Sequence, residues 1–312
     1  MNVIQGFPND IPLKNAFITI GVYDGVHVGH QKVLNTLIAD ARAVGGCTAV
    51  ITFHPHPMRV LNPDYAPPQI TCTGHKMRLM EQMGIDNCYV IHFDAQFATL
   101  THEQFFNDLI LPNFCVREIC VGYDASFGRN KEGTLAFLCD ISAKHGFIVK
   151  QVDAVTVDDL VVSSTCIRKL VIAGEFELVE EMLGRPYSLL GTVVTGQTLG
   201  RQIGYPTANL DPHHEAIPPS GVYIVKIHIA GETFFGMLNI GYRPTFEPAD
   251  GLRESIEVHI LDFSRDIYNQ DMEIVLLKKL RDERRFPNAD ALIQQIQHDE
   301  FVTREYIKNM LR

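Results

Sequence analysis

No stretch of this 312-residue sequence is apolar for long enough to cross a membrane. The longest apolar runs, such as Cys47–Phe53, fall far short of the ~18 residues that a membrane span needs. The first residues, MNVIQGFPNDIPLKN, also lack the basic and then apolar order of a secretory signal. We therefore expect a soluble cytoplasmic protein with no membrane partner.

Paired cysteines are missing as well. The seven cysteines are an odd number, none of them forms a CxxC pair, and all of them precede residue 167. This pattern does not indicate a disulfide framework. We expect reduced cysteines that belong to the core.

An excess of positive charge is also absent. Residues 1–186 carry 14 basic and 20 acidic side chains, and residues 187–312 carry 13 and 17. Neither part has the basic surface that sequence-independent binding to nucleic acid requires. If the ligands are anions, local features must hold them: helix N-termini, single arginines and a divalent metal.

What is present is a globular composition with 46% hydrophobic residues and a length that suits two domains. In the first half, helical patterns alternate with short apolar runs that predict strands; the strands are expected at 16–22, 47–53, 88–93, 118–122 and 147–152, and the helices at 31–44 and 101–111. This order predicts a parallel sheet with helices on both faces. Ligands then bind at the carboxyl ends of the strands.

The second half has a different rhythm. Strand patterns separated by glycine and proline turns are expected at 189–195, 222–230, 233–240, 255–261 and 272–280, with one helix at about 289–311. We expect a small β-barrel closed by a C-terminal helix. The segment 183–188 is the expected junction, so the predicted domains are 1–186 and 187–312.

The most informative segment of the first half is ITIGVYDGVHVGHQKVL (18–34), in which a strand passes through a turn directly into a helix. His27 and His30, with Gly29 between them, place two imidazoles and backbone N–H groups at the mouth of a helix. This arrangement suits a triphosphate, because the helix end attracts anions and imidazoles can donate to charge that develops on phosphorus. The alternative is a hairpin turn at Asp24–Gly25 with incidental histidines.

This segment resembles the FDGVHxGH signature of the prokaryotic bifunctional riboflavin kinase/FAD synthetases, which are HxGH nucleotidyltransferases with a Rossmann-like domain. Three more segments follow in that family's order: TFHPHP (52–57) resembles TFxPHP, GYDASFGRNKEG (122–133) resembles GxDFxFGxxRxG, and SSTCIR (163–168) resembles SSTxIR. The resemblance implies that the phosphate of FMN attacks the α-phosphate of ATP to give FAD and pyrophosphate.

The resemblance also implies roles for residues of the first half. His27 and His30 would act on the triphosphate in the transition state. ATP and its phosphates would be held by residues of the first and last of these segments, namely Gly25, Gly29, Ser163, Ser164, Thr165 and Arg168. Contacts to the nucleotide or the flavin are expected from His54, His56, Asp124, Phe127 and Gly128.

In the second half, GTVVTGQTLGRQIGYPTANL (191–210) resembles the GxVxxGxxxGRxLGxPTAN signature of flavokinases. Its Gly196, Gly200, Arg201 and Gly204 would contact ATP. Thr207 and Asn209 are two residues apart, so on a strand they would offer two oxygen ligands to Mg²⁺ from one face. The resemblance implies ATP as co-substrate and Mg²⁺ as cofactor.

The segment SIEVHIL (255–261) places Glu257 and His259 on one face of a strand. By resemblance, Glu257 is the general base for the 5′-hydroxyl of riboflavin, which attacks the γ-phosphate of ATP. Arg281 of LRDERRF (280–286) would be a supporting contact to nucleotide or flavin. His213 and His214 have no third ligand placed nearby, so we interpret them as a loop.

The sequence departs from the family pattern at four positions. Tyr23 replaces Phe, and Asn269 replaces a turn glycine, which Asn can do because it accepts the left-handed conformation. Ala125 replaces an aromatic residue and Lys131 an arginine, which weakens stacking and bidentate phosphate contacts in the 122–133 loop. Three alternatives follow: a riboflavin kinase with a weakened adenylyltransferase site, a non-catalytic flavin carrier, and a tRNA-charging HxGH enzyme, which the short chain and the lack of a basic surface disfavour. The sequence leaves the oligomeric state open.

Overall fold

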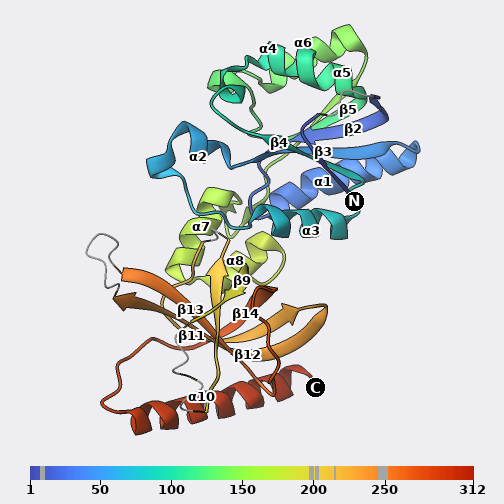
Figure 1. The fold of residues 1–312 in the computed structure, drawn as a ribbon. Coiled ribbons are helices and arrows are strands. Elements are labelled where there is room, and N and C mark those ends of the chain that lie inside the picture. Colours follow the sequence, from blue (N-terminus) through green and yellow to red (C-terminus); the bar gives the residue numbers. More distant parts are fainter. Residues whose placement is uncertain (8–10, 197–199, 201–203, 214–215, 245–251) are drawn as a thin grey trace. The chain divides into compact units, whose positions relative to one another are not determined.

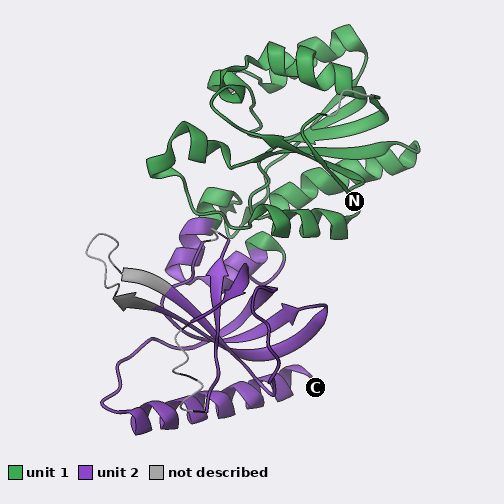
Figure 2. Ribbon diagram, viewed as in Figure 1, with its two compact units in different colours: residues 1–167, 182–184 green, residues 168–181, 185–312 purple. Residues whose placement is uncertain are grey.

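The computed structural model describes residues 1–7, 11–196, 200, 204–213, 216–244 and 252–312. Contacts divide the chain into two units, which Figure 2 colours separately. Unit 1 comprises residues 1–167 and 182–184, and unit 2 comprises residues 168–181 and 185–312.

Unit 1 is built on a sheet of six parallel strands. The strands are β1 (Asn2–Gln5), β2 (Leu13–Ile20), β3 (Cys47–His54), β4 (Asn87–His92), β5 (Phe114–Gly122) and β6 (Ile148–Val152). Their spatial order is β1-β4-β3-β2-β5-β6, and every neighbouring pair is parallel. The expected parallel sheet is confirmed. Strand β1 was not expected, because four residues at the sheet edge are too few to show a pattern.

Helices cover both faces of this sheet (Figure 1). Helices α1 (Val28–Ala43) and α3 (Thr73–Met83) cover one face, and α4 (His102–Gln104), α5 (Leu111–Asn113) and α6 (Leu135–His145) cover the other. The chain also forms α2 (Pro57–Leu61), α7 (Ser164–Ala173) and α8 (Phe176–Leu183), and residues 168–181 of the last two belong to unit 2. On one face, Leu34 and Ile38 of α1 and Met80 of α3 pack on the strands. On the other face, the phenylalanines of the segment after α4 and the apolar side of α6 form the larger core.

Two expected helices differ in detail. The helix expected at 31–44 begins three residues earlier, because His27 caps it at Val28. The helix expected at 101–111 is interrupted: the capping box of Thr101 and Gln104 is present, but Phe105–Ile110 form a π-helical segment before α5. The wider turn places Phe105, Phe106 and Ile110 in the core together, which is why the regular helix gives way.

The order of the strands fixes where a ligand can bind. The chain moves from β2 outward through β3 to β4 and then crosses back to β5 on the other side of β2. The carboxyl ends of β2 and β5 therefore flank the point at which the winding direction reverses. In open α/β sheets, this is the position of the ligand crevice.

Unit 2 is a closed antiparallel barrel with the order β10-β13-β12-β11-β14-β9. Its elements are β9 (Ser188–Val194), β10 (Ala208–Pro212), β11 (Gly221–Ile229), β12 (Glu232–Pro244), β13 (Leu252–Ile260), β14 (Asp271–Arg281) and α10 (Ala289–Met310). The predicted barrel with a C-terminal helix is confirmed, and β10 is an additional strand that closes it. Asn269 has φ +61°, the left-handed conformation expected for a residue in place of glycine.

The cysteines follow the prediction in part. All seven are free thiols, and Cys72, Cys88 and Cys120 are buried. Cys115 and Cys139 are exposed, which corrects the expectation that all belong to the core. Tyr23 is buried, and its hydroxyl lies 2.5 Å from Thr19 Oγ1, so unit 1 accommodates the additional hydroxyl of this tyrosine.

One buried carboxyl in unit 1 makes its stability depend on pH. Glu118 on β5 is 5% exposed and lies near Asp40 of α1 and Lys150 of β6. Burial first, and then the charge of Asp40, raise the pKa of Glu118 to about 7, against the opposing effect of Lys150. Since the folded state holds this proton more tightly than the unfolded chain, stability falls as pH rises from the unfolded pKa toward 7.

We therefore expect Glu118→Gln to stabilise unit 1 at pH 8 by about 1–2 kcal/mol and to give no gain at pH 5. This free-energy gain is smaller than the full pKa shift of Glu118 would give, because the neighbouring Lys150 side chain remains in contact with water. Urea unfolding of both proteins at the two pH values measures the difference. A gain of the same size at both pH values would contradict this account.

Candidate active sites

The turn between β2 and α1 presents the two histidines at the crevice. His27 is the N-cap of α1, and its Nδ1 accepts a hydrogen bond from the backbone N–H of His30 at 3.2 Å. The rings of His27 and His30 are stacked, with centroids 3.5 Å apart. Because Nδ1 of His27 is an acceptor, the proton of the neutral ring is assigned to Nε2, which makes that atom a donor.

His30 is held neutral by its surroundings. Burial, followed by the nearby His27 and Lys76, lowers the pKa of His30 well below its ordinary value. Its ring also packs edge-on against Tyr23, with centroids 5.0 Å apart. Nδ1 of His30 is buried and has no hydrogen-bond partner in the described part of the chain. Such a group suits an incoming anionic ligand, since negative charge would favour protonation or hydrogen bonding there.

A cavity of about 450 Å³ lies at the carboxyl ends of β2, β5 and β6. Among the predicted site residues, its lining includes His27, Gly29, His30, Asp124, Ser163, Ser164 and Thr165. Neither α1 nor α7 has an acidic residue in its first turn, and both helices begin at this cavity. Two helix N-termini therefore direct their positive ends at one crevice, which favours a polyphosphate.

The hydroxyls at the start of α7 also have structural bonds. Ser163 Oγ accepts from the N–H of Cys166, and Ser164 Oγ donates to the carbonyl of Asp24 at 2.9 Å. The start of α7 is thereby tied to the turn that carries the histidines. The distant segments 24–30 and 163–165 meet at one site, as the resemblance implies.

A second cavity of about 650 Å³ shares Ile20, Gly21, Val22 and Ser126 with the crevice. Aromatic side chains dominate it: Phe53, Phe93, Phe97, Phe105 and Phe127. Gly128 and His56 also line it, and His56 Nδ1 caps α2 by accepting from Met58 N–H at 3.1 Å. A large planar ring fits such walls, and the shared residues place it next to the polyphosphate crevice.

The remaining residues predicted for unit 1 lie elsewhere. Gly25 has φ +84° and lines neither cavity, and its N–H donates to Thr71 Oγ1 at 2.9 Å. His54 also lines neither cavity; its Nδ1 lies 2.9 Å from Thr73 Oγ1. Arg168 follows on α7 but belongs by its contacts to unit 2.

The loop with the two unusual residues keeps an ordered backbone. Phe127 and Gly133 exchange backbone hydrogen bonds, and the N–H of Arg129 donates to the carbonyl of Leu100 at 2.9 Å. Ala125 lines the crevice, while the ring of Phe127 packs against Phe105 at 5.5 Å. The aromatic contact of this loop is therefore made by Phe127.

In unit 2, one level of the barrel collects the predicted polar residues. Glu257 on β13 pairs with Asn209 on β10 and with Asn239 on β12. Asn239 pairs in turn with Val222 on β11, and Val222 with Arg281 on β14. Directly opposed residues share a face of the sheet, so these side chains lie on one face. The alternate residues Ile256, Val258 and Ile260 are buried, as the pattern of SIEVHIL predicts.

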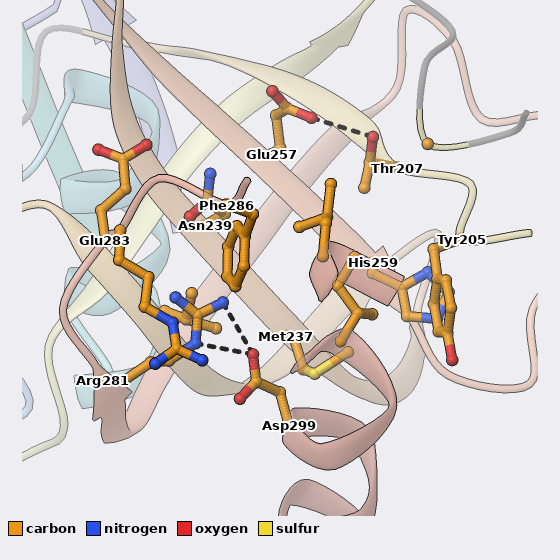
Figure 3. Close-up of a pocket in the computed structure, with 15 residues that line it drawn as sticks. Tyr205, Thr207, Met237, Asn239, Glu257, His259, Arg281, Glu283, Phe286 and Asp299 are labelled. Carbon is orange, nitrogen blue, oxygen red and sulfur yellow. Dashed lines mark hydrogen bonds and ion pairs between the residues drawn. The ribbon is translucent and has the colours of Figure 1, made fainter. Parts of the chain in front are cut away.

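This face borders a pocket of about 300 Å³ (Figure 3). Thr207 Oγ1 donates to Glu257 Oε2 at 3.2 Å, and Ser255 Oγ donates to Glu257 Oε1 at 3.1 Å. In Figure 3, Glu257 and Thr207 lie at one end of the pocket and the Arg281–Asp299 ion pair lies toward the other end. The ring of Phe286 lies between them. Arg281 Nε and Asp299 Oδ2 are 2.9 Å apart, which ties α10 to β14.

A further cavity of about 490 Å³ shares Thr207 with this pocket and continues along Val193, Phe263, Arg265 and Tyr268. The two cavities therefore meet at Thr207, beside Glu257. The structure places Gly196 against Asn209, because a Cβ at residue 196 would meet Asn209 Nδ2 at 2.0 Å. A Cβ at residue 200 would meet the carbonyl oxygen of Tyr205 at 2.3 Å, and Gly204 has φ +85°.

Among the described residues, no three His, Cys, Asp or Glu side chains gather in a way that could hold a metal ion. Thr207, Asn209 and Glu257 offer a hydroxyl, an amide and a carboxylate oxygen within one region. This donor set fits Mg²⁺, which is usually bound through one or two protein oxygens together with substrate phosphates. Arg201 and His214 lie outside the described residues.

Among the helices that the structure describes, none has the length and apolarity to cross a membrane.

Sequence reasoning missed several residues that line the cavities. Phe93, Phe97 and Phe105 come from three segments of unit 1, and Asn239 and Asp299 come from β12 and α10. The sequence placed Phe93 at the end of an expected strand, Phe105 in an expected helix and Asn239 in an expected strand, but it did not single out any of them as a site residue. Which aromatic residues meet is decided by packing over long sequence separations.

Comparison with known proteins agrees with the two-part fold. The family model described as FAD synthetase matches residues 11–166, and the model described as riboflavin kinase matches residues 183–307. The chain is 36% identical to the bifunctional riboflavin kinase/FMN adenylyltransferase of Escherichia coli (strain K12), over 98% of each chain. It is 38% identical to that of Bacillus subtilis (strain 168), over 94% of this chain and 93% of the relative.

A crystal structure titled as a macrolide-efflux protein from Streptococcus pneumoniae has the same fold, with a TM-score of 0.83 and 31% identity, and the match covers 97% of this chain and 99% of that one. Both family models and the near full-length relatives lead to one conclusion: the chain belongs to the bifunctional riboflavin kinase/FMN adenylyltransferase family.

Proposed function

We propose that the chain phosphorylates riboflavin to FMN with ATP and then joins FMN to the adenylyl group of a second ATP, giving FAD and pyrophosphate. The observation that carries the proposal is the position of the HxGH turn: it lies where the winding of the sheet reverses, beside an aromatic cavity. We assign the adenylyl transfer to residues 1–186 and the kinase to residues 187–312. Because both reactions consume ATP, we propose the cytoplasm as their location.

In the adenylyl transfer, a phosphate oxygen of FMN attacks the α-phosphorus of ATP and the bond to pyrophosphate breaks. His27 and His30 contact the triphosphate and stabilise the charge that develops at the reacting phosphorus. Gly29, Ser163, Ser164, Thr165 and Arg168 hold the departing pyrophosphate together with the N-terminus of α7. The chain's contribution is position and charge, with no covalent intermediate.

The ring of FMN occupies the aromatic cavity of unit 1, between the phenylalanines and His56. Support comes from the residues that the cavity shares with the crevice, because a flavin ring there leaves its phosphate at the site of attack. Asp124, Phe127 and Gly128 complete the contacts to nucleotide and flavin.

In the kinase, Glu257 accepts the proton of the 5′-hydroxyl of riboflavin as that oxygen attacks the γ-phosphorus of ATP. Riboflavin lies in the pocket with Phe286 and Arg281, and ATP lies in the neighbouring cavity that begins at Thr207. We assign the contacts to the phosphates of ATP to Gly196, Gly200, Arg201 and Gly204. Thr207 and Asn209 would hold Mg²⁺, which offsets phosphate charge when it is bound.

Chromatography of flavins tests the proposal in a single reaction. The purified protein is incubated with riboflavin, ATP and Mg²⁺, and in parallel with a chelator in excess of the metal. We expect FMN first and FAD later, and neither product when the metal is removed. FMN without FAD would support the kinase-only alternative, whereas bound but unchanged riboflavin would support the carrier.

A further inference from the structure

Lys76 on α3 is a buried lysine that lines neither cavity of unit 1. Only 2% of the residue is exposed. Its Nζ donates to the carbonyl of Val22 at 2.8 Å and to Thr52 Oγ1 at 3.1 Å. Thr52 Oγ1 donates to the same carbonyl at 3.2 Å. Strand β3, helix α3 and the turn after β2 are thus joined at one ammonium group.

The turn after β2, whose Val22 carbonyl accepts from Lys76, has a strained backbone. Tyr23 and Val26 have φ values of +54° and +40°, on either side of Gly25 at +84°. A β-branched residue at positive φ is a clear outlier. Such a residue is energetically costly and persists only where its surroundings over-determine its conformation. His27 follows Val26 directly, so the position of the catalytic pair depends on what holds this turn.

The segment just before Lys76 supplies the other contacts. The carboxylate of Asp24, which is 3% exposed, accepts from the N–H groups of Ile70 and Thr71 at 2.9 Å and 3.0 Å. Thr71 Oγ1 accepts from the N–H of Gly25 at 2.9 Å. Residues 70–76 therefore hold Val22, Asp24 and Gly25 in succession, and Lys76 brings an ammonium group to these contacts.

We propose that Lys76 is a positioning residue of the adenylyl transfer: it fixes the strained turn through the Val22 carbonyl, and its buried charge strengthens the positive potential beneath the triphosphate. This inference rests on the proposed role of the crevice. The proposal explains why a charged lysine is buried here at an energetic cost. An apolar side chain of the same length would fill the space without the desolvation of an ammonium group.

The charge of Lys76 changes within an accessible pH range. Burial lowers the pKa of Lys76 to about 8, against the opposing effect of Asp24 and then of Cys88 and Cys72. Burial also lowers the pKa values of His30 and His54 and raises that of Cys88 to about 12, so these three neighbours carry no charge near pH 8. The positive charge of Lys76 is lost as pH rises through about 8.

The test compares Lys76→Met, Lys76→Arg and the control Arg78→Met, which alters an exposed residue of the same helix. We expect Lys76→Met to lower kcat for FAD formation about 10²-fold, since displaced catalytic groups cost that much. FMN formation from riboflavin should be unchanged in all three variants. For the natural protein, kcat/KM for FAD formation should fall as pH rises through about 8. In Lys76→Arg this decline should move to higher pH, because a guanidinium stays charged.

Three results would overturn the proposal. The first is FAD formation at the natural rate in Lys76→Met. The second is a loss of both FAD formation and FMN formation in that variant. The third is an alkaline decline of Lys76→Arg at the same pH as in the natural protein. If Lys76→Met does not fold, Thr52→Val removes one acceptor of Nζ at constant shape and should show a smaller but equally selective loss. Failure of the proposed crevice itself would show separately, as retained FAD formation in His30→Ala.

Discussion

Replacing His30 with alanine is expected to abolish FAD formation and to leave FMN formation from riboflavin unchanged. His30 lies at the mouth of α1, stacked on His27 and facing the crevice, and its buried Nδ1 has no hydrogen-bond partner among the residues that the structure describes. Removing a group that stabilises charge in the transition state costs about 10²–10³-fold in rate. Because the kinase residues belong to a barrel with its own core, FMN formation provides an internal measure of folding.

The experiment follows both products by chromatography after addition of riboflavin, and FAD alone after addition of FMN. His145→Ala is the matched control, because His145 is an exposed histidine at the end of α6 in the same unit. Loss of both activities in a folded His30→Ala protein would show that the two reactions are not divided as proposed.

Replacing Glu257 with glutamine is expected to have the converse effect. FMN formation should fall by about 10²–10⁴-fold, the usual contribution of a general base. Glutamine keeps an oxygen that can accept from Thr207 or Ser255, so the shape of the pocket is retained while the proton acceptor is lost. FAD formation from added FMN should continue at the natural rate.

Glu305→Gln is the control for this variant, since Glu305 is an exposed carboxylate on α10, away from the pocket. Retained kinase activity in Glu257→Gln would exclude Glu257 as the base. Loss of FAD formation from added FMN would show instead that the substitution acts beyond the barrel.

The two variants together discriminate between the alternatives. A kinase with a weakened adenylyltransferase site would lose its activity in Glu257→Gln and show little FAD in any variant. A carrier would bind flavin in both variants without consuming ATP. The ordered loop around Phe127, with its backbone bonds to Gly133 and Leu100, favours a working adenylyltransferase despite Ala125.

Local order was readable from the sequence because its causes are local. The cap of α1 depends on His27 and His30, three residues apart, and the alternating face of β13 depends on the two-residue repeat of a strand. The same reasoning gave the parallel sheet and the barrel, whose strands follow from short apolar runs between turns. It failed at Phe105–Ile110, where a π-helical segment replaces the regular α-helix so that the apolar side chains can pack in the core.

The sequence by itself determined the class of fold, the order of its two parts and the turns that carry the chemistry. Only the tertiary structure decided which distant residues meet: the phenylalanines beside His56, the level of the barrel that joins Asn209, Glu257 and Asn239, and the contact of Lys76 with Val22. These contacts join segments far apart in the chain, and nothing in residue spacing records them. They form because burial and hydrogen bonding are satisfied for the whole unit at once.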